Sequence, residues 1–396
     1  LESVAEPIDL TSRETLIQAM NTCLSSKIVG QNSDVLSPIA VDSVLAVLGG
    51  DHTVEDIDLN DIRIVKQLGG TCDDCEIVTN GIVLPAPDAS AGGPQLIENA
   101  KIGLIQFCLS APKTDLENNV VVSDYAAMDR ILREERKHIL GLCKKIKKAG
   151  CTVLLVQKSI LRDATNDLSL HFLAKMGIMV VKDVERKDIE FISRTVGCSP
   201  VAHVDSFTAD KLGHAECVEQ VSIGGSSHRV CKITGLETVG NTVSVLVRGS
   251  NQLVLDEADR SLHDALCVLR CLVKKRFLIT GAGAPEAEIA VQLSRWAKTQ
   301  TGMASYCAKA YAEALEVIPY ALAENAGLNP IRAVTALRAA HNEGQASAGI
   351  NVRVGSICDM REQNVLQPLL VSTSAIELAT ETVSLILRID DICQVR

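Results

Sequence analysis

Residues 264–286 read Asp264-Ala-Leu-Cys-Val-Leu-Arg-Cys-Leu-Val-Lys-Lys-Arg-Phe-Leu-Ile-Thr-Gly-Ala-Gly-Ala-Pro-Glu286. Its apolar spacing predicts the end of one helix, and Pro285 suits the first turn of a second helix, where no backbone donor is needed. The small residues 281–283 predict a loop that lets a flat or anionic ligand approach the backbone. The alternative is an ordinary tight turn, because the loop lacks the third glycine of the dinucleotide fingerprint.

Composition narrows the class of protein. The chain has 396 residues, enough for roughly two or three domains, and only 3% aromatic residues, so its core must be aliphatic. The formal net charge of -10 argues against nucleic acid as the main partner. No apolar run approaches the roughly 18 residues of a membrane span, so we expect no membrane-spanning segment.

The 14 cysteines are scattered without regular spacing, which is typical of reduced thiols that pack as small hydrophobes. Cys72-Asp-Asp-Cys75 has no second pair at zinc spacing and no aromatic redox signature, so we predict neither a metal nor a redox centre there. The 8 histidines are dispersed, which argues against a metabolic enzyme with a clustered acid and base.

The predicted elements are helical, then mixed α/β, then helical. Strands at 152–156 and 178–181 flank a helix at 167–175, which predicts a right-handed βαβ unit. We expect this helix to be fully buried; the alternative is an apolar face that meets exposed segments of a client protein. The two helical ends most simply form one domain that is interrupted by an α/β insertion.

Two further features of the sequence each allow two interpretations. The turn Ser25-Ser26-Lys27 between two predicted helices is either a solvated loop or a phosphate contact, because hydroxyls and an ammonium suit an anion. A long helix is predicted from Ser123 or Asp124 to about Lys148. Its charged middle and apolar end predict that one end packs and the other projects, unless it is an ordinary surface helix.

Together, these residues resemble the group II chaperonins. The resemblance implies an α/β multi-domain fold, in which a mostly helical equatorial domain is interrupted by an intermediate hinge domain and by an α/β apical domain with a helical protrusion. It runs along essentially the whole chain and is densest at Lys27, 61–70, 157–160, 247–249, 263–266, 281–286, 323–330, 348–352 and 367–368.

The resemblance also implies domain bounds. The expected equatorial domain is 1–50 (partial) with 268–396, the intermediate domain is 51–78 with 240–267, and the apical client-binding domain is 79–239 with a lid protrusion at about 110–148.

The implied function is that of a subunit of a cytoplasmic, ATP-driven chaperonin. Such a subunit encloses and folds unfolded proteins, and ATP hydrolysis is coupled to closure of a built-in lid. The implied cofactors are ATP or ADP with Mg²⁺. The implied partners are other chaperonin subunits in a double hetero-oligomeric ring and clients such as actin and tubulin, with no nucleic acid and no membrane. The alternative is a non-catalytic client-binding or assembly fragment.

Site residues follow from the resemblance position by position. Asp264 matches the carboxylate that orients the attacking water. The other matches are the phosphate-sensing Ser25, Ser26 and Lys27, the loop Gly281, Ala282 and Gly283 beneath the nucleotide, Asn351 and Val352 around the adenine, and Gln367 at the ribose.

The chain departs from the family pattern at two points. Ala282 replaces a glycine, so one methyl group crowds the nucleotide. The phosphate loop Gly-Asp-Gly-Thr-Thr does not occur; it would precede Leu1 with the main Mg²⁺ carboxylate, so we assign no metal ligand here. We therefore expect little or no ATPase activity from this polypeptide alone.

Overall fold

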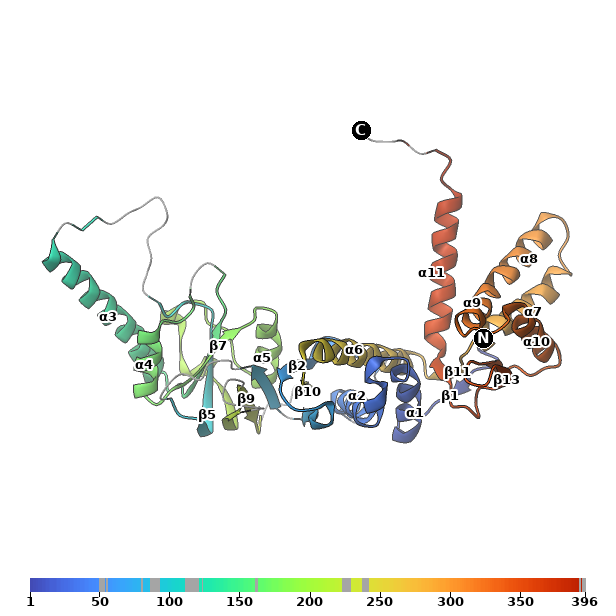
Figure 1. Ribbon diagram of the computed structural model, residues 1–396. Coiled ribbons are helices and arrows are strands. Elements are labelled where there is room, and N and C mark those ends of the chain that lie inside the picture. Colours follow the sequence, from blue (N-terminus) through green and yellow to red (C-terminus); the bar gives the residue numbers. More distant parts are fainter. Residues whose placement is uncertain are drawn as a thin grey trace. The chain divides into compact units, whose positions relative to one another are not determined.

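The computed structural model describes residues 1–49, 54, 56–79, 81–85, 93–110, 121–122, 124–160, 163–222, 229–236, 242–391 and 393 (Figure 1). The chain forms two compact units. The first comprises Leu1–Val41, Asp51–Ile57 and Arg260–Arg396, and the second comprises Asp42–Gly50 and Asp58–Asp259. The second unit is therefore inserted into the first, which confirms the predicted α/β insertion into a helical domain.

The first unit is mainly helical. Its strands β1, β11 and β14 form a small antiparallel sheet in which Leu278 pairs with both Glu6 and Pro368. Helices α2 and α6 each run from one unit into the other. The elements are β1 (Glu6–Pro7), α1 (Arg13–Leu24), α2 (Ser33–Leu48), α6 (Gln252–Lys274), β11 (Phe277–Thr280), α7 (Ala284–Ala297), α8 (Met303–Leu315), α9 (Val317–Asn325), α10 (Pro330–Asn342), β12 (Ala348–Asn351), β13 (Ser356–Asp359), β14 (Leu366–Pro368) and α11 (Leu369–Leu387).

The second unit holds a six-stranded sheet of order β4-β9-β8-β5-β6-β7 and a three-stranded sheet of order β2-β10-β3. Strands β6 and β7 are parallel and flank α4, so the predicted βαβ unit is confirmed. The elements are β2 (Ile62–Leu68), β3 (Glu76–Thr79), β4 (Gly81–Pro85), β5 (Leu96–Ile105), α3 (Tyr125–Lys148), β6 (Val153–Gln157), α4 (Asp167–Lys175), β7 (Met179–Val184), α5 (Asp188–Val196), β8 (Gly213–Ser222), β9 (Arg229–Thr234) and β10 (Val243–Gly249).

Helix α4 is less buried than its sequence predicts. Leu173 is fully buried, but Leu168, Leu170 and Phe172 are only partly buried against the same core cluster. The expectation of full burial was wrong, because the helix carries apolar residues on more than the one face that the sheet covers. The alternative, an apolar face that meets a client protein, stays a prediction.

Helix α3 packs at one end only, as predicted. Asp124 caps it by accepting a hydrogen bond from Ala126 N. Ile139 and Ile146 are buried toward its C-terminal end. At its start Tyr125 is 96% exposed, so this end projects from the core. The rest of the expected protrusion, residues 111–120 and Ser123, lies outside the described residues.

Helix α11 changes one expectation. Among the described residues, it is the one helix that is long and apolar enough to cross a membrane by length and composition alone. The sequence prediction overlooked it because Glu377 and Glu381 interrupt the apolar run. A core helix of a soluble protein meets the same criterion, so the observation is weak on its own.

Candidate functional site

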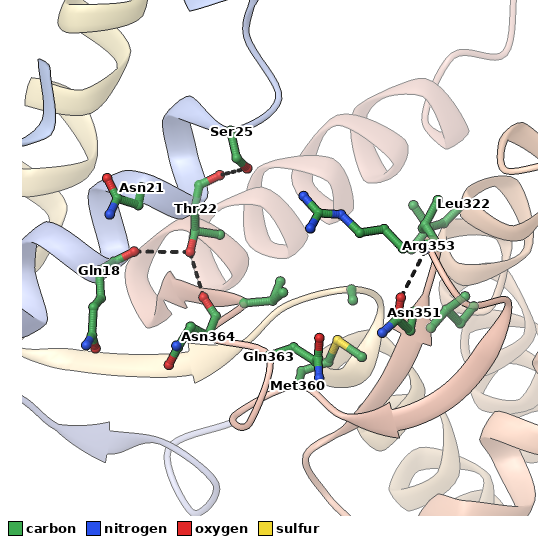
Figure 2. A pocket seen from close by; sticks show the side chains of 14 residues that line it. Gln18, Asn21, Thr22, Ser25, Leu322, Asn351, Arg353, Met360, Gln363 and Asn364 are labelled. Atoms are coloured by element: carbon green, nitrogen blue, oxygen red, sulfur yellow. Dashed lines mark hydrogen bonds between the residues drawn. The ribbon is translucent and has the colours of Figure 1, made fainter. Parts of the chain in front are cut away.

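A cavity of about 590 Å³ opens in the first unit, lined by residues of α1, the loop before α7, α9, β12 and the segment that leads to β14 (Figure 2). Its size is within the range of sites that take small molecules. Four residues predicted from the resemblance line it: Ser25, Ala282, Asn351 and Val352.

Helix α1 presents one polar face to the cavity. Gln18, Asn21, Thr22 and Ser25 are spaced by three or four residues, so they lie on the same side of the helix. Thr22 Oγ1 donates a hydrogen bond of 2.8 Å to the carbonyl oxygen of Asn364, which ties α1 to the segment before β14. The other face is buried and apolar, with Leu16, Ala19, Met20 and Leu24. Packing of that apolar face therefore turns the polar residues toward the cavity.

The loop 281–283 is fixed between β11 and α7. Gly281 N donates to the Val365 carbonyl oxygen at 2.9 Å, and Ile350 N donates to the Ala282 carbonyl oxygen at 3.2 Å. Ala282 has a φ of +58°, in the left-handed region that costs a residue with a Cβ about 1–2 kcal/mol. The hydrogen bonds on both sides hold the loop in this conformation, and the Ala282 methyl group lines the cavity.

Lys27 and Asp264 form an ion pair. The distance from Lys27 Nζ to Asp264 Oδ2 is 2.6 Å, and the two side chains are 32% and 48% exposed. Asp264 lies on α6, and Lys27 follows the C-terminal end of α1. The pair combines an ammonium, which can contact a phosphate, with a carboxylate, which can accept a hydrogen bond from water.

Gln367 lies beside the loop without lining the cavity. Its Nε2 donates to Ser372 Oγ at 2.8 Å, which orients the side-chain amide. Its Oε1 lies 3.6 Å from the place where a Cβ on Gly281 would stand. Gln367 therefore offers an oriented acceptor next to the backbone of the loop.

Comparison with known proteins decides the family. A family model described as "TCP-1/cpn60 chaperonin family" matches residues 1–396. The chain belongs to this chaperonin family. It is 60% identical over 396 residues to T-complex protein 1 subunit delta of Arabidopsis thaliana and 59% identical over 396 residues to that of Homo sapiens. Each alignment covers 100% of this chain and 73% of the relative.

A solved structure supports the same assignment. An open state monomer of a group II chaperonin from Methanococcoides burtonii aligns with a TM-score of 0.72 and 29% identity, over 98% of this chain and 89% of that one. The predicted multi-domain group II chaperonin fold is therefore confirmed, and so is the prediction of chaperonin function at the level of the family. Within the family, the runs 101–115 and 122–125 resemble the delta subunit of the eukaryotic cytosolic chaperonin (TRiC), and the matches to T-complex protein 1 subunit delta confirm this more specific resemblance.

Not all predicted residues of the chaperonin chain meet at one surface. Ser25, Ala282, Asn351 and Val352 line the cavity, and Lys27 pairs with Asp264. The other six predicted residues are outside the cavity lining: Ser26, Lys27, Asp264, Gly281, Gly283 and Gln367. The exposed Ser26 makes a long hydrogen bond of 3.5 Å, from its Oγ to the Cys23 carbonyl oxygen. Domain bounds and residue roles remain predictions.

Sequence reasoning missed several residues that line the cavity. Gln18, Asn21 and Thr22 could have been found from the uncharged polar spacing on α1. Arg353 and Asn364 had no such signal, because they come from turns whose direction depends on strand pairing. These residues make the cavity more polar than the predicted set alone would.

Thiols lie near the ion pair, and they stay protonated. Burial raises the pKa of the Cys23 thiol, and the Asp264 carboxylate adds to this shift. Burial and Asp264 likewise raise the pKa of Cys267. All fourteen cysteines are free, including Cys72 and Cys75, whose pKa values burial also raises. A raised pKa disfavours the reactive thiolate.

The described residues fit a nucleotide better than a metal ion. The cavity, the open loop and the oriented acceptors suit a base and a sugar. In the described part of the chain, no group of three or more His, Cys, Asp or Glu residues could hold a metal. These residues therefore do not form a Mg²⁺ site by themselves, and we assign no step to the metal.

Proposed function

We propose that this chain acts as an ATP-hydrolysing subunit of a cytoplasmic chaperonin. It would assemble with other chaperonin subunits in a double hetero-oligomeric ring, enclose unfolded clients such as actin and tubulin, and couple hydrolysis to closure of a lid. Similarity over all 396 residues of this chain to T-complex protein 1 delta subunits, of which it spans 73%, supports this proposal. The observation that carries it is the Lys27–Asp264 ion pair, which joins the end of α1, whose polar face lines the cavity, to α6.

The residues would share the nucleotide between them. Asn351 and Val352 would contact the base, and the Gln367 amide oxygen would accept a hydrogen bond from the ribose beside Gly281. The open backbone of the loop would lie beneath the nucleotide, where a larger side chain than that of Ala282 would intrude.

The ion pair would serve the chemistry. Lys27, with the hydroxyls of Ser25 and Ser26, would bind the outer phosphates. The Asp264 carboxylate would accept a hydrogen bond from the attacking water and orient it toward the outer phosphate. Because Lys27 holds this carboxylate in one place, water would meet an acceptor of fixed position.

The second unit would bind the client proteins. The partly buried Leu168, Leu170 and Phe172 of α4 and the exposed start of α3 offer apolar surface. Unfolded proteins expose apolar segments, which such a surface can bind without a fixed sequence. The proposed apical domain, 79–239, contains both elements.

Helix α6 suggests how the two activities are coupled. It is one continuous helix from Gln252 to Lys274, it carries Asp264, and it runs from the second unit into the first. A continuous helix moves as a rigid element. A shift of α6 would therefore move the carboxylate that is proposed to orient the water.

A second candidate is a client-binding module that does not bind nucleotide, since the sequence lacks Gly-Asp-Gly-Thr-Thr. Titration calorimetry of the purified chain with ATP and with ADP separates the two. Saturable binding with one site per chain is expected from the first proposal. No heat with either nucleotide, together with binding of a denatured client, would favour the second.

A further inference from the structure

The cavity in the first unit has an unusual charge distribution. Of the residues that line it, seven are uncharged and polar and six are apolar, and the remaining one, Arg353, is charged. Among the described residues that line the cavity there is no carboxylate, and Arg353 is the one cation.

The Arg353 guanidinium points into this space. Figure 2 shows its side chain extended from the end of β12, with the guanidinium directed toward Thr22 and Ser25 of α1. In the described part of the chain it has no hydrogen bond or ion pair of its own side chain. Its donors are thus free to bind a ligand.

The backbone beneath Arg353 is fixed. Asn351 Oδ1 accepts hydrogen bonds from Arg353 N at 3.0 Å and from Val354 N at 3.2 Å. Gly355 N donates to the Asn351 carbonyl oxygen at 2.8 Å, which closes the turn. The side chain therefore starts from a rigid turn, and less conformational entropy is lost when the guanidinium binds a ligand.

We propose that Arg353 binds the first phosphate of a nucleotide in this cavity, a contact that rests on the nucleotide binding proposed above. With the base at Asn351 and Val352 and the outer phosphates at Lys27, the guanidinium would face the middle of the nucleotide. A planar guanidinium matches two phosphate oxygens at once. Arg353 would thereby distinguish a nucleotide from a nucleoside.

Three variants test this contact in the full 396-residue chain. Arg353→Gln removes the charge but keeps a polar side chain, and Arg353→Lys keeps the charge but loses the planar fork. The matched control is Arg332→Gln, at an exposed arginine on α10 that does not line the cavity. Each protein is titrated with ADP, AMP and adenosine by calorimetry without added Mg²⁺.

Arg353→Gln is expected to weaken AMP and ADP about tenfold each and to leave adenosine unchanged. Arg353→Lys should lie between the wild type and Arg353→Gln, and Arg332→Gln should match the wild type. The AMP affinity of the wild type should also fall with salt more steeply than that of Arg353→Gln.

Three outcomes overturn the contact alone while the wild type still binds ADP. The first is that Arg353→Gln binds all three ligands as tightly as the wild type does. The second is that Arg353→Gln loses as much affinity for adenosine as for AMP. The third is that Arg353→Gln loses affinity for ADP but not for AMP, which would place the arginine at an outer phosphate. If the wild type binds none of the three ligands, the proposed nucleotide function fails, and the Arg353 contact fails with it.

Discussion

The Lys27 ammonium lies 2.6 Å from the Asp264 carboxylate, although 237 positions separate the two residues. Both side chains are partly exposed, so the attraction between them is screened by water and contributes little to the free energy of unfolding. Because the ion pair contributes little to the free energy of unfolding, its role is better explained by the two side chains that it positions. It holds the proposed water-orienting carboxylate next to the proposed phosphate-binding lysine.

Removal of the carboxylate should affect turnover and spare binding. In the assembled chaperonin, Asp264→Asn is expected to lower ATP hydrolysis at least about a hundredfold with little change in the Kd for ATP, because the amide cannot polarise water in the same way. Glu257→Gln, on the same helix, is the control and should hydrolyse ATP normally. Normal hydrolysis by Asp264→Asn would remove Asp264 from the mechanism.

Substitution of Lys27 should lower the affinity for ATP and leave the free energy of unfolding nearly unchanged. Lys27→Met is expected to change the free energy of unfolding by less than about 1 kcal/mol, since the pair is partly exposed. ATP affinity should nevertheless fall, because the proposed phosphate contact is lost. Chemical denaturation and nucleotide titration measure the two effects. A loss of several kcal/mol with unchanged affinity would make the pair purely structural.

The conformation of Ala282 predicts a stabilising substitution. Ala282→Gly should raise the free energy of unfolding by up to about 1 kcal/mol, because glycine adopts a φ of +58° without strain. Ala284→Gly is the matched control: this alanine is buried at the start of α7, and its replacement should destabilise by about 1 kcal/mol. Denaturant titration compares them, and destabilisation by Ala282→Gly would contradict the argument.

The buried side chain of His341 connects three secondary-structure elements. Its ring is 2% exposed, its Nδ1 lies 2.7 Å from Glu288 Oε2, and its Nε2 lies 3.0 Å from the Ala348 carbonyl oxygen. The ring therefore links α10, α7 and β12. His341→Ala should destabilise the chain by about 2–4 kcal/mol, because it leaves a cavity and removes one hydrogen-bond partner each from Glu288 Oε2 and the Ala348 carbonyl oxygen.

Thermal or chemical unfolding measures this loss. His138→Ala, at an exposed histidine of α3, is the control and should cost less than about 0.5 kcal/mol. Equal effects of the two substitutions would show that the hydrogen bonds of His341 do not stabilise the fold.

Glu286 gives a prediction for pH. Burial raises the pKa of its carboxyl above the ordinary value, so the charged form destabilises the folded chain once the pH rises through the folded pKa. Below the unfolded pKa, this penalty is absent. Glu286→Gln should therefore raise the free energy of unfolding at pH 7, and the gain should vanish below about pH 4. Exposed Glu324 supplies the control, Glu324→Gln, which should change the free energy of unfolding at pH 7 by less than about 0.5 kcal/mol.

Elements with a local signal could be predicted from the amino-acid sequence. The βαβ unit around α4, the capped start of α3 and the small-residue loop before α7 all follow from patterns within a few turns of chain. The family motifs were equally local, since each is a short run of fixed residue types. Even the insertion of an α/β segment between helical ends could be predicted from the order of these elements.

How these elements contact one another could not be predicted from local patterns and became visible in the folded chain. Pairing of Lys27 with Asp264, the cavity between α1 and the turn after β12, and the direction of Arg353 depend on contacts across hundreds of residues. The half-buried face of α4 and the left-handed Ala282 likewise depend on what packs against them. Local periodicity fixes which face of a helix is apolar, but the free energy of packing decides which partner covers it.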